Sequence, residues 1–248
     1  MHKSRSMICK GCWSQLHAPV VIRGPLSIPF RLVGLRISRM NPNVCTMCEK
    51  WFARIIRFKK WGTKQIGVPA TVLFADLRGY TSLSESLDSP QVARILSRFY
   101  ENCASAIWER DGIVNKLIGD AVLALFNWPI KQGDHVQQAV MAGIELQKRS
   151  REIHQIEGVS VGIGVGIQVG DVAIGELSEF CKDYTYTAFG PVVNLAARLQ
   201  GAAQPGEVLV TEEVYRHVEG LFPEAESRVC HLKGIDKPVN AHVLHVKP

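Results

Sequence analysis

From residue 69 onward, apolar and polar residues follow regular patterns that predict alternating strands and helices. The run "ATVLFAD" is almost wholly apolar and predicts a buried strand that ends at Asp76. The stretch "PQVARILSRFYENCASAIWERDG" has helical spacing and predicts a helix from about Pro90 to near Gly112. Next, "IVNKLIGDAVLALF" predicts two apolar strands joined by a turn at Gly119 and Asp120.

The remainder of the chain predicts a second set of elements. "DHVQQAVMAGIELQKRSREIHQ" indicates a long helix, and "VSVGIGVGIQVGDVAIGEL" indicates two strands that turn at Gly170 and Asp171. A further helix is expected near "VVNLAARLQG", followed by short strands and helices. In order, these elements predict an α+β fold of the ferredoxin-like βαββαβ type, with helices on one face of the sheet and extra C-terminal strands.

The first 66 residues have little periodicity, apart from the helix-like stretch "CEKWFARIIRFKKW". Apolar side chains fall on one side of this helix and basic side chains on another, as in helices that lie on an anionic membrane surface. Packing on the following domain, or on a second copy of itself, explains the pattern equally well. The residues concerned are Trp51, Ile55 and Phe58 on the apolar side and Arg54, Arg57 and Lys60 on the basic side.

Charge divides the 248-residue chain at the same place. Residues 1–66 hold thirteen Lys and Arg against one acid, whereas residues 67–248 hold 16 basic and 22 acidic residues. We therefore expect a basic, Cys-containing regulatory or anchoring segment (1–66) joined to a catalytic domain (67–248). Apolar runs are too short to span a bilayer and no secretory signal is evident, which predicts a cytoplasmic protein, at most peripheral to the inner face of the membrane.

Two C-x-x-C pairs lie in the basic segment: Cys9 with Cys12, and Cys45 with Cys48. Paired motifs of this kind are typical of structural Zn²⁺ sites, although the 32 residues between them exceed the commonest spacing. The alternatives are two unrelated pairs of thiols or, less in keeping with the pattern, an iron–sulfur cluster.

Asp76 and Asp120 should meet, because the first strand and the hairpin of the second and third are neighbours in a βαββαβ sheet. Two adjacent carboxylates repel unless cations hold them, and hard oxygen ligands suit Mg²⁺ or Mn²⁺. The loop "LRGYTSLSE" after Asp76 offers backbone amides and hydroxyls at a helix N-terminus, which suits phosphate. Such a site would serve two-metal chemistry on a nucleotide, as in a polymerase palm or a diguanylate cyclase.

Three motifs make a more specific resemblance. "VLFADLRGYTSLSE", "NKLIGDAVLALF" and "YTAFGPVVNLAARLQ", in this order, resemble the catalytic domain of the class III adenylate and guanylate cyclases over about residues 69–246. The combination of Lys and Thr described below resembles the Thr-containing subgroup of bacterial adenylate cyclases. The resemblance does not extend to residues 1–66.

The resemblance assigns a role to each matching residue. Asp76 and Asp120 would bind two Mg²⁺ or Mn²⁺ ions per active site. Lys116 would donate to N1 of adenine, where guanine-specific members carry an acidic group, and Thr187 would read the exocyclic amine. Asn194 and Arg198, at i and i+4 on one helix, would orient the ribose and stabilise charge on the α-phosphate. The remaining substrate-binding residues would be Leu77, Arg78, Gly79, Tyr80 and Thr81 around the phosphates, and Lys233, favoured over Lys237 by its "LKG" context.

The resemblance also implies an assembly and a reaction. One metal ion would lower the pKa of the ATP 3′-hydroxyl and the other would hold the phosphates, giving cyclic AMP and pyrophosphate. Each site would lie between two chains of a head-to-tail homodimer, so the monomer should be inactive. The alternative is a catalytically weak nucleotide-binding regulatory module that acts through protein contacts. The sequence does not favour a nucleic-acid binder, since no recognition motif accompanies the basic charge.

Overall fold

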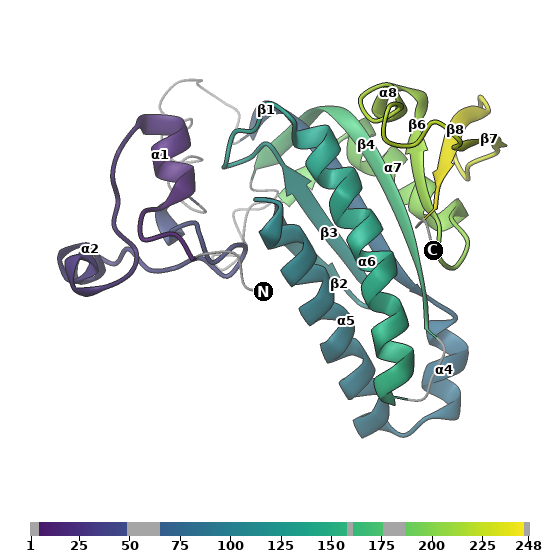
Figure 1. The fold of residues 1–248 in the computed structure, drawn as a ribbon, viewed down its shortest axis with the longest axis horizontal. Helices are drawn as coiled ribbons and strands as arrows, with labels where there is room; N and C mark the ends of the chain where they lie inside the picture. The colour runs from purple at the N-terminus through teal and green to yellow at the C-terminus, as the bar shows by residue number, and fades with distance from the viewer. Residues whose placement is uncertain (1–4, 49–64, 158–160, 176–186, 246–248) are drawn as a thin grey trace.

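The computed structural model describes residues 5–48, 65–157, 161–175 and 187–245 (Figure 1). Within these ranges, eight strands form one sheet in the order β2-β3-β1-β4-β6-β8-β7, with β5 paired to β4. The strands are β1 (Gln65–Arg78), β2 (Ile113–Ile118), β3 (Ala121–Phe126), β4 (Gly162–Gly175), β5 (Thr187–Phe189), β6 (Val208–Thr211), β7 (Glu226–Cys230) and β8 (Val239–Leu244). The helices are α1 (Lys10–Leu16), η1 (Pro25–Ser27), α2 (Ile28–Leu32), α4 (Tyr80–Ser86), α5 (Ser89–Glu109), α6 (His135–Glu157), α7 (Pro191–Ala202) and α8 (Glu212–Tyr215).

The order of the four core strands, β2-β3-β1-β4, is antiparallel throughout, which confirms the predicted α+β fold. β1 is longer than its apolar run and pairs with β4 over fourteen positions, from Gln65 opposite Gly175 to Arg78 opposite Gly162. α5 begins at Ser89 because Asp88 and Gln91 form a reciprocal capping box there. These elements place the end of β1 and the β2–β3 turn at the same edge of the sheet.

The predicted turn at Gly170 and Asp171 is wrong. Both residues lie inside the continuous strand β4, where they pair with Ala70 and Pro69 of β1. A Gly-Asp pair is a local turn signal, and here the long ladder with β1 overrides it. Gly170 instead allows a close approach: a Cβ at this position would lie 2.8 Å from Cγ2 of Val192 in α7.

Helices cover both faces of the sheet, so the expectation that they lie on one face is also wrong (Figure 1). Side chains of a strand alternate between faces. Leu73 and Leu77 of β1 pack into the cluster formed with α5 and α6, whereas Val72 and Phe74 pack into the cluster that includes Val193 and other residues of α7. α7 therefore lies over the face opposite α5 and α6.

Residues 5–48, here called the N-terminal module, lie beside the start of β2 (Figure 1). The module contains α1, η1 and α2, with two isolated β-bridges and a small apolar cluster that also includes Ile130 of the catalytic domain. The amphipathic helix predicted around residues 51–60 lies outside the described residues. None of the described helices is both long enough and apolar enough to cross a bilayer.

Candidate active site

Asp76 and Asp120 lie side by side at one edge of the sheet. Asp76 is opposite Ala121 in the β1–β3 ladder, and the Leu77 amide donates to the Asp120 carbonyl at 3.3 Å. The turn before β3 is tight, with Gly119 in the left-handed region at φ 60°. The Tyr100 hydroxyl of α5 donates to the Gly119 carbonyl and so holds this turn. The structure thus brings together the two carboxylates that the sequence paired.

The environment of Asp76 disfavours a charged carboxylate unless a cation is present. Burial raises the pKa of Asp76 to about 6, and the neighbouring Asp120 carboxylate acts in the same direction. The Arg78 guanidinium and a hydrogen bond from Gln200 lower the pKa but do not offset these effects. Asp76 Oδ1 is buried and has no hydrogen-bond partner among the described residues. A buried carboxylate oxygen without a partner, next to a second carboxylate, fits a divalent metal ion.

Gln200, at the end of α7, connects the helix to Asp76. Its Nε2 donates to Asp76 Oδ2 at 3.0 Å, and its backbone carbonyl accepts a hydrogen bond from the Arg78 guanidinium. Asn194 and Arg198 lie on the exposed face of the same helix, as their i and i+4 spacing predicted. Sequence reasoning missed Gln200, whose role depends on how closely α7 approaches β1.

The approach of α7 to the sheet depends on Gly166 in β4. A Cβ at Gly166 would overlap the Gln200 amide nitrogen and the Ala196 carbonyl of α7. Gly164 has a similar function, because a Cβ there would occupy the space of the Arg78 guanidinium. The glycines of "VGIGVGIQVG" therefore provide the room in which α7 and Arg78 reach Asp76.

Lys116 and Thr187 lie on strands that meet through a buried asparagine. The β2–β3 ladder shifts register between Val114 and Lys116, so Asn115 is the extra residue of a β-bulge. Asn115 Oδ1 accepts a hydrogen bond from the Ala188 amide at 3.3 Å, which joins β2 to β5. Lys116 directly follows Asn115 and Thr187 directly precedes Ala188, so each residue predicted to recognise the base adjoins this hydrogen bond. Sequence reasoning missed Asn115, although an Asn within an apolar strand is an unusual signal.

Only part of the predicted phosphate-binding loop is free to bind an anion. The Leu77 amide already bonds to Asp120, and the Arg78 side chain bonds to Gln200. Gly79 has φ 75° and precedes α4 without a side-chain cap, so the first amides of that helix, at Tyr80 and Thr81, have no partner within it. These amides, rather than those of Leu77 and Arg78, suit an anion.

The candidate lysines near the C-terminus lie far from the carboxylates of their own chain. Lys233 and Lys237 are exposed in the loop between β7 and β8. β4, β6 and β8 lie between β1, which carries Asp76, and the edge strand β7. One chain alone therefore does not bring these lysines to its own Asp76 and Asp120.

Comparison with known proteins identifies the family. The chain matches the adenylate and guanylate cyclase catalytic domain over residues 64–246. An adenylate cyclase of Anabaena cylindrica is 33% identical over 179 residues, which are 68% of this chain and 33% of that protein. An adenylate cyclase of Mycobacterium tuberculosis is 26% identical over 166 residues, 66% of this chain and 37% of that protein. The chain thus spans about a third of the length of these curated relatives.

Solved structures show the same likeness. The adenylyl cyclase CyaB from P. aeruginosa aligns with a TM-score of 0.66 at 28% identity, covering 74% of this chain and 97% of that chain. The guanylyl cyclase Cya2 aligns with a TM-score of 0.65 at 28% identity, covering 72% and 92%. The fold and the paired carboxylates therefore define a nucleotidyl cyclase catalytic domain.

This chain belongs to the class III adenylate and guanylate cyclases, whose members generally use divalent metal ions. Both adenylyl and guanylyl cyclases are among the similar proteins, so membership of the family does not by itself assign a purine base to this chain.

Proposed function

We propose that this protein is an adenylate cyclase that converts ATP to 3′,5′-cyclic AMP and pyrophosphate in intracellular signalling. The main support is the pairing of Asp76 with Asp120 in a chain that also carries Lys116 and Thr187 beside one contact between β2 and β5. The first pair suits metal-dependent phosphate chemistry, and the second suits adenine.

The hydrogen-bonding capacities of Lys116 and Thr187 match adenine. A Lys ammonium can only donate, so it suits the acceptor N1 of adenine and not the N1–H of guanine. The Thr187 side chain is buried, and its hydroxyl donates to the Ala188 carbonyl at 3.4 Å. With its proton so directed, the Thr187 oxygen keeps lone pairs that can accept from the 6-amino group of adenine.

Asp76 and Asp120 would hold two Mg²⁺ or Mn²⁺ ions. Such ions, when bound, neutralise phosphate charge and make the ribose 3′-hydroxyl more acidic. The chain's own residues would orient the reactants. Asn194 would position the ribose and Arg198 would stabilise negative charge on the α-phosphate.

In the reaction, the 3′-oxygen forms a bond to the α-phosphorus as the bond from that phosphorus to the β-phosphate oxygen breaks. The 3′-proton passes to solvent water, and pyrophosphate is released. The amides of Gly79, Tyr80 and Thr81, together with Lys233, would hold the phosphates that depart.

A homodimer explains why Asn194 and Arg198 face outward. Asn194 and Arg198 are exposed on α7, while Gln200 of the same helix turns back to Asp76 of its own chain. In a head-to-tail dimer, the exposed face of α7 in one chain would complete the site that contains Asp76 and Asp120 of the other chain. Two equivalent sites would then form between the two chains.

The test is production of cyclic AMP from Mn²⁺-ATP by the purified full chain, with GTP assayed in parallel. We expect cyclic AMP formation that Arg198→Ala reduces by about 100-fold or more. Arg216→Ala, which removes an exposed arginine directly after α8, is the matched control and should retain activity. Nucleotide binding without turnover in the wild type would instead favour the regulatory module. A preference for GTP would overturn the assignment to adenine.

A further inference from the structure

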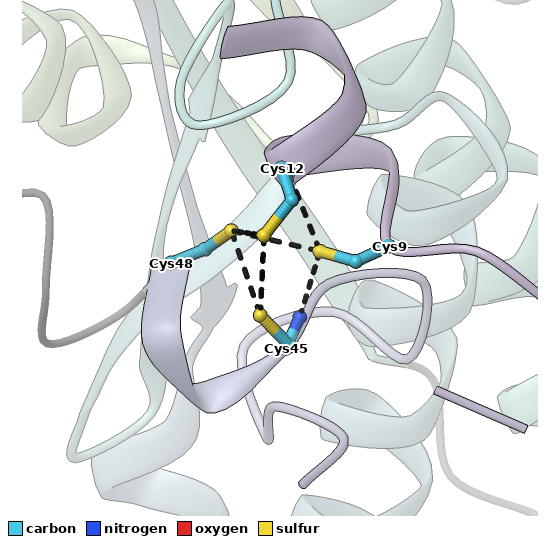
Figure 2. A group of neighbouring side chains, drawn as sticks. All are labelled: Cys9, Cys12, Cys45 and Cys48. Carbon is cyan, nitrogen blue, oxygen red and sulfur yellow. Dashed lines mark hydrogen bonds between the residues drawn. The ribbon is translucent and has the colours of Figure 1, made fainter. Parts of the chain in front are cut away.

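The four cysteines of the N-terminal module converge on one buried point (Figure 2). Their Sγ atoms all lie within 4.8 Å of one another, and all four residues have 0% exposure. Cys12 Sγ is 3.5 Å from Cys45 Sγ and 3.4 Å from Cys48 Sγ. Cys48 Sγ is also 3.5 Å from Cys9 Sγ and 3.8 Å from Cys45 Sγ. Two C-x-x-C pairs far apart in the sequence thus form a single cluster.

These distances select one kind of centre. Four thiolates around one tetrahedral Zn²⁺, with Zn–S bonds of about 2.3 Å, lie about 3.8 Å from each other. A disulfide requires a separation of about 2.0 Å, far shorter than any found here. An iron–sulfur cluster distributes its four cysteines over two or more iron atoms, which forces some of the sulfurs farther apart than this cluster allows. The geometry fits a single tetrahedral ion.

The surroundings are also those of a metal–thiolate site. Cys9 Sγ accepts hydrogen bonds from the amides of Cys12 at 3.4 Å and Cys45 at 3.1 Å, which suit a thiolate. Gly11, within the first C-x-x-C, has no room for a side chain, because a Cβ would lie 2.8 Å from Cys48 Sγ. An apolar shell excludes water from the sulfurs; it consists of Val20, Ile22, Val44 and Ile130.

The N-terminal module has little else to hold it together. Its described residues include helices of seven and five residues and two isolated β-bridges. A segment of this size rarely folds on its apolar core alone and commonly needs a metal or disulfides. Four buried thiols would add little stability without an ion, whereas a structural zinc site supplies folding free energy directly.

The module is attached to the catalytic domain where β2 begins. Lys10 Nζ contacts both carboxylate oxygens of Asp111 at 2.6 and 2.7 Å, and Asn41 Nδ2 donates to the Gly112 carbonyl at 2.7 Å. The Met40 carbonyl accepts from the Val114 amide at 3.0 Å. Val114 is two residues from Lys116, on the same strand.

We infer that Cys9, Cys12, Cys45 and Cys48 bind one structural Zn²⁺, and that the ion holds the N-terminal module against the start of β2, the strand that carries Lys116. Lys10 flanks Cys9 directly, and Asn41 precedes Cys45 by four residues, so both attachments adjoin the metal ligands in sequence. Loss of the ion should therefore release the β2 attachments along with the module. This inference does not depend on whether the domain turns over ATP.

Metal analysis of the full chain tests the zinc site. We expect about one zinc per chain, with X-ray absorption showing four sulfur ligands at about 2.3 Å. Cys12→Ser and Cys45→Ser should lower the zinc content at least fivefold. Cys230→Ser is the matched control, because Cys230 is buried in the C-terminal part of the sheet, and it should retain zinc. Iron in place of zinc, no stoichiometric metal, or a disulfide in the purified chain would overturn the inference.

A second measurement needs no cysteine variant and so remains decisive if those variants fail to fold. Zinc removed from the wild type is replaced by Co²⁺, which should give thiolate-to-cobalt charge transfer and the intense visible bands of a tetrahedral site. Hydrogen exchange then tests the attachment. Zinc removal should speed exchange of the Val114 amide at least tenfold and leave the Leu73 amide in the centre of β1 unchanged. Equal protection of Val114 with and without zinc would refute the link to β2.

Discussion

Gln200 Nε2 donates a 3.0 Å hydrogen bond to Asp76 Oδ2, which joins the helix carrying Asn194 and Arg198 to one carboxylate of the Asp76–Asp120 pair. Gln200→Ala removes a donor that lowers the pKa of Asp76. We expect the acid limb of the kcat/KM profile to move to higher pH and kcat/KM at neutral pH to fall about 10-fold, since hydrogen bonds to charged groups contribute about 1.5–3 kcal/mol. Gln204→Ala, whose side chain is exposed beyond α7, is the control. An unchanged pH profile in Gln200→Ala would contradict this role.

The raised pKa of Asp76 links metal binding to the pH dependence of stability. Because the pKa in the folded chain is about 6, above its ordinary value of 3.8, folding favours the protonated carboxyl. This contribution to stability is present in full at pH below 3.8 and is lost as the pH rises to about 6. Without metal, Asp76→Asn should therefore be more stable than the wild type at pH 7. Thermal unfolding across this pH range measures the difference.

Mn²⁺ should stabilise the wild type and not Asp76→Asn. At pH 7 Mn²⁺ should raise the Tm of the wild type, because it binds the ionised carboxylates of the folded state, and should have little effect on Asp76→Asn. The Mn²⁺ effect on the wild type should fade as the pH drops below about 6. A Tm shift by Mn²⁺ that is equal in both proteins would show that the ion binds elsewhere.

Mixing two inactive variants tests the shared site. Asp76→Ala lacks one of the two carboxylates proposed to bind metal, and Arg198→Ala lacks the arginine proposed to stabilise charge on the α-phosphate. Each homodimer should therefore be inactive. Random reassociation of equal amounts should restore about a quarter of wild-type activity, because half of the dimers then contain one intact site out of two. A mixture of Asp76→Ala with Asp120→Ala is the control and should stay inactive, since both changes damage the same half. No recovery in the first mixture would rule out the shared-site dimer.

Nucleotide choice should depend on Lys116 and on the bulge that presents it. Lys116→Glu replaces a donor with an acceptor and should lower kcat/KM for ATP about 10- to 100-fold. Asn115→Ala should weaken ATP use less and raise KM more than it lowers kcat, because it disturbs the position of Lys116 and leaves its charge intact. Lys148→Glu, on the exposed side of α6, is the control for charge reversal. Steady-state kinetics with ATP and GTP measure these effects.

Two glycines offer a matched test of how α7 packs. Gly166→Ala places a methyl group against the Gln200 amide and the Ala196 carbonyl, and should reduce the free energy of unfolding by about 1–3 kcal/mol. Gly201→Ala, within α7, meets nothing within 4 Å and should be neutral or stabilise the chain by up to about 1 kcal/mol. Urea unfolding distinguishes them. Equal stability of the two variants would contradict the close approach of α7 to β4.

The sequence predicted best those strands and turns that are determined by the local pattern of apolar residues. The apolar run that ends at Asp76 and the hairpin that turns at Asp120 predicted three strands and placed the two carboxylates together. The turn expected at Gly170 failed because a local turn signal cannot report that β1 extends to Gln65 and pairs past it. Strand length was thus decided by a partner about a hundred residues away.

The residues missed by sequence reasoning share one cause. Gln200, Asn115 and Tyr100 act through hydrogen bonds that span 124, 73 and 19 residues. No spacing rule connects such pairs, so their roles become visible only once α7, β5 and α5 are placed on the sheet. The cysteine pairs were recognisable because each is a local motif, whereas the contact between Lys10 and Asp111 was not.

Met40 shows that the N-terminal module contributes to the core of the catalytic sheet. Its side chain, 7% exposed, packs in the same cluster as Val72 and Phe74 of β1, and its carbonyl accepts from the Trp108 indole N–H at 2.6 Å. The family likeness starts at residue 64, after this contact. A chain cut at that point would expose an apolar area of the sheet and leave the Trp108 donor unsatisfied. The stretch that matches the catalytic-domain family and the stretch needed for a complete core are therefore different parts of this chain.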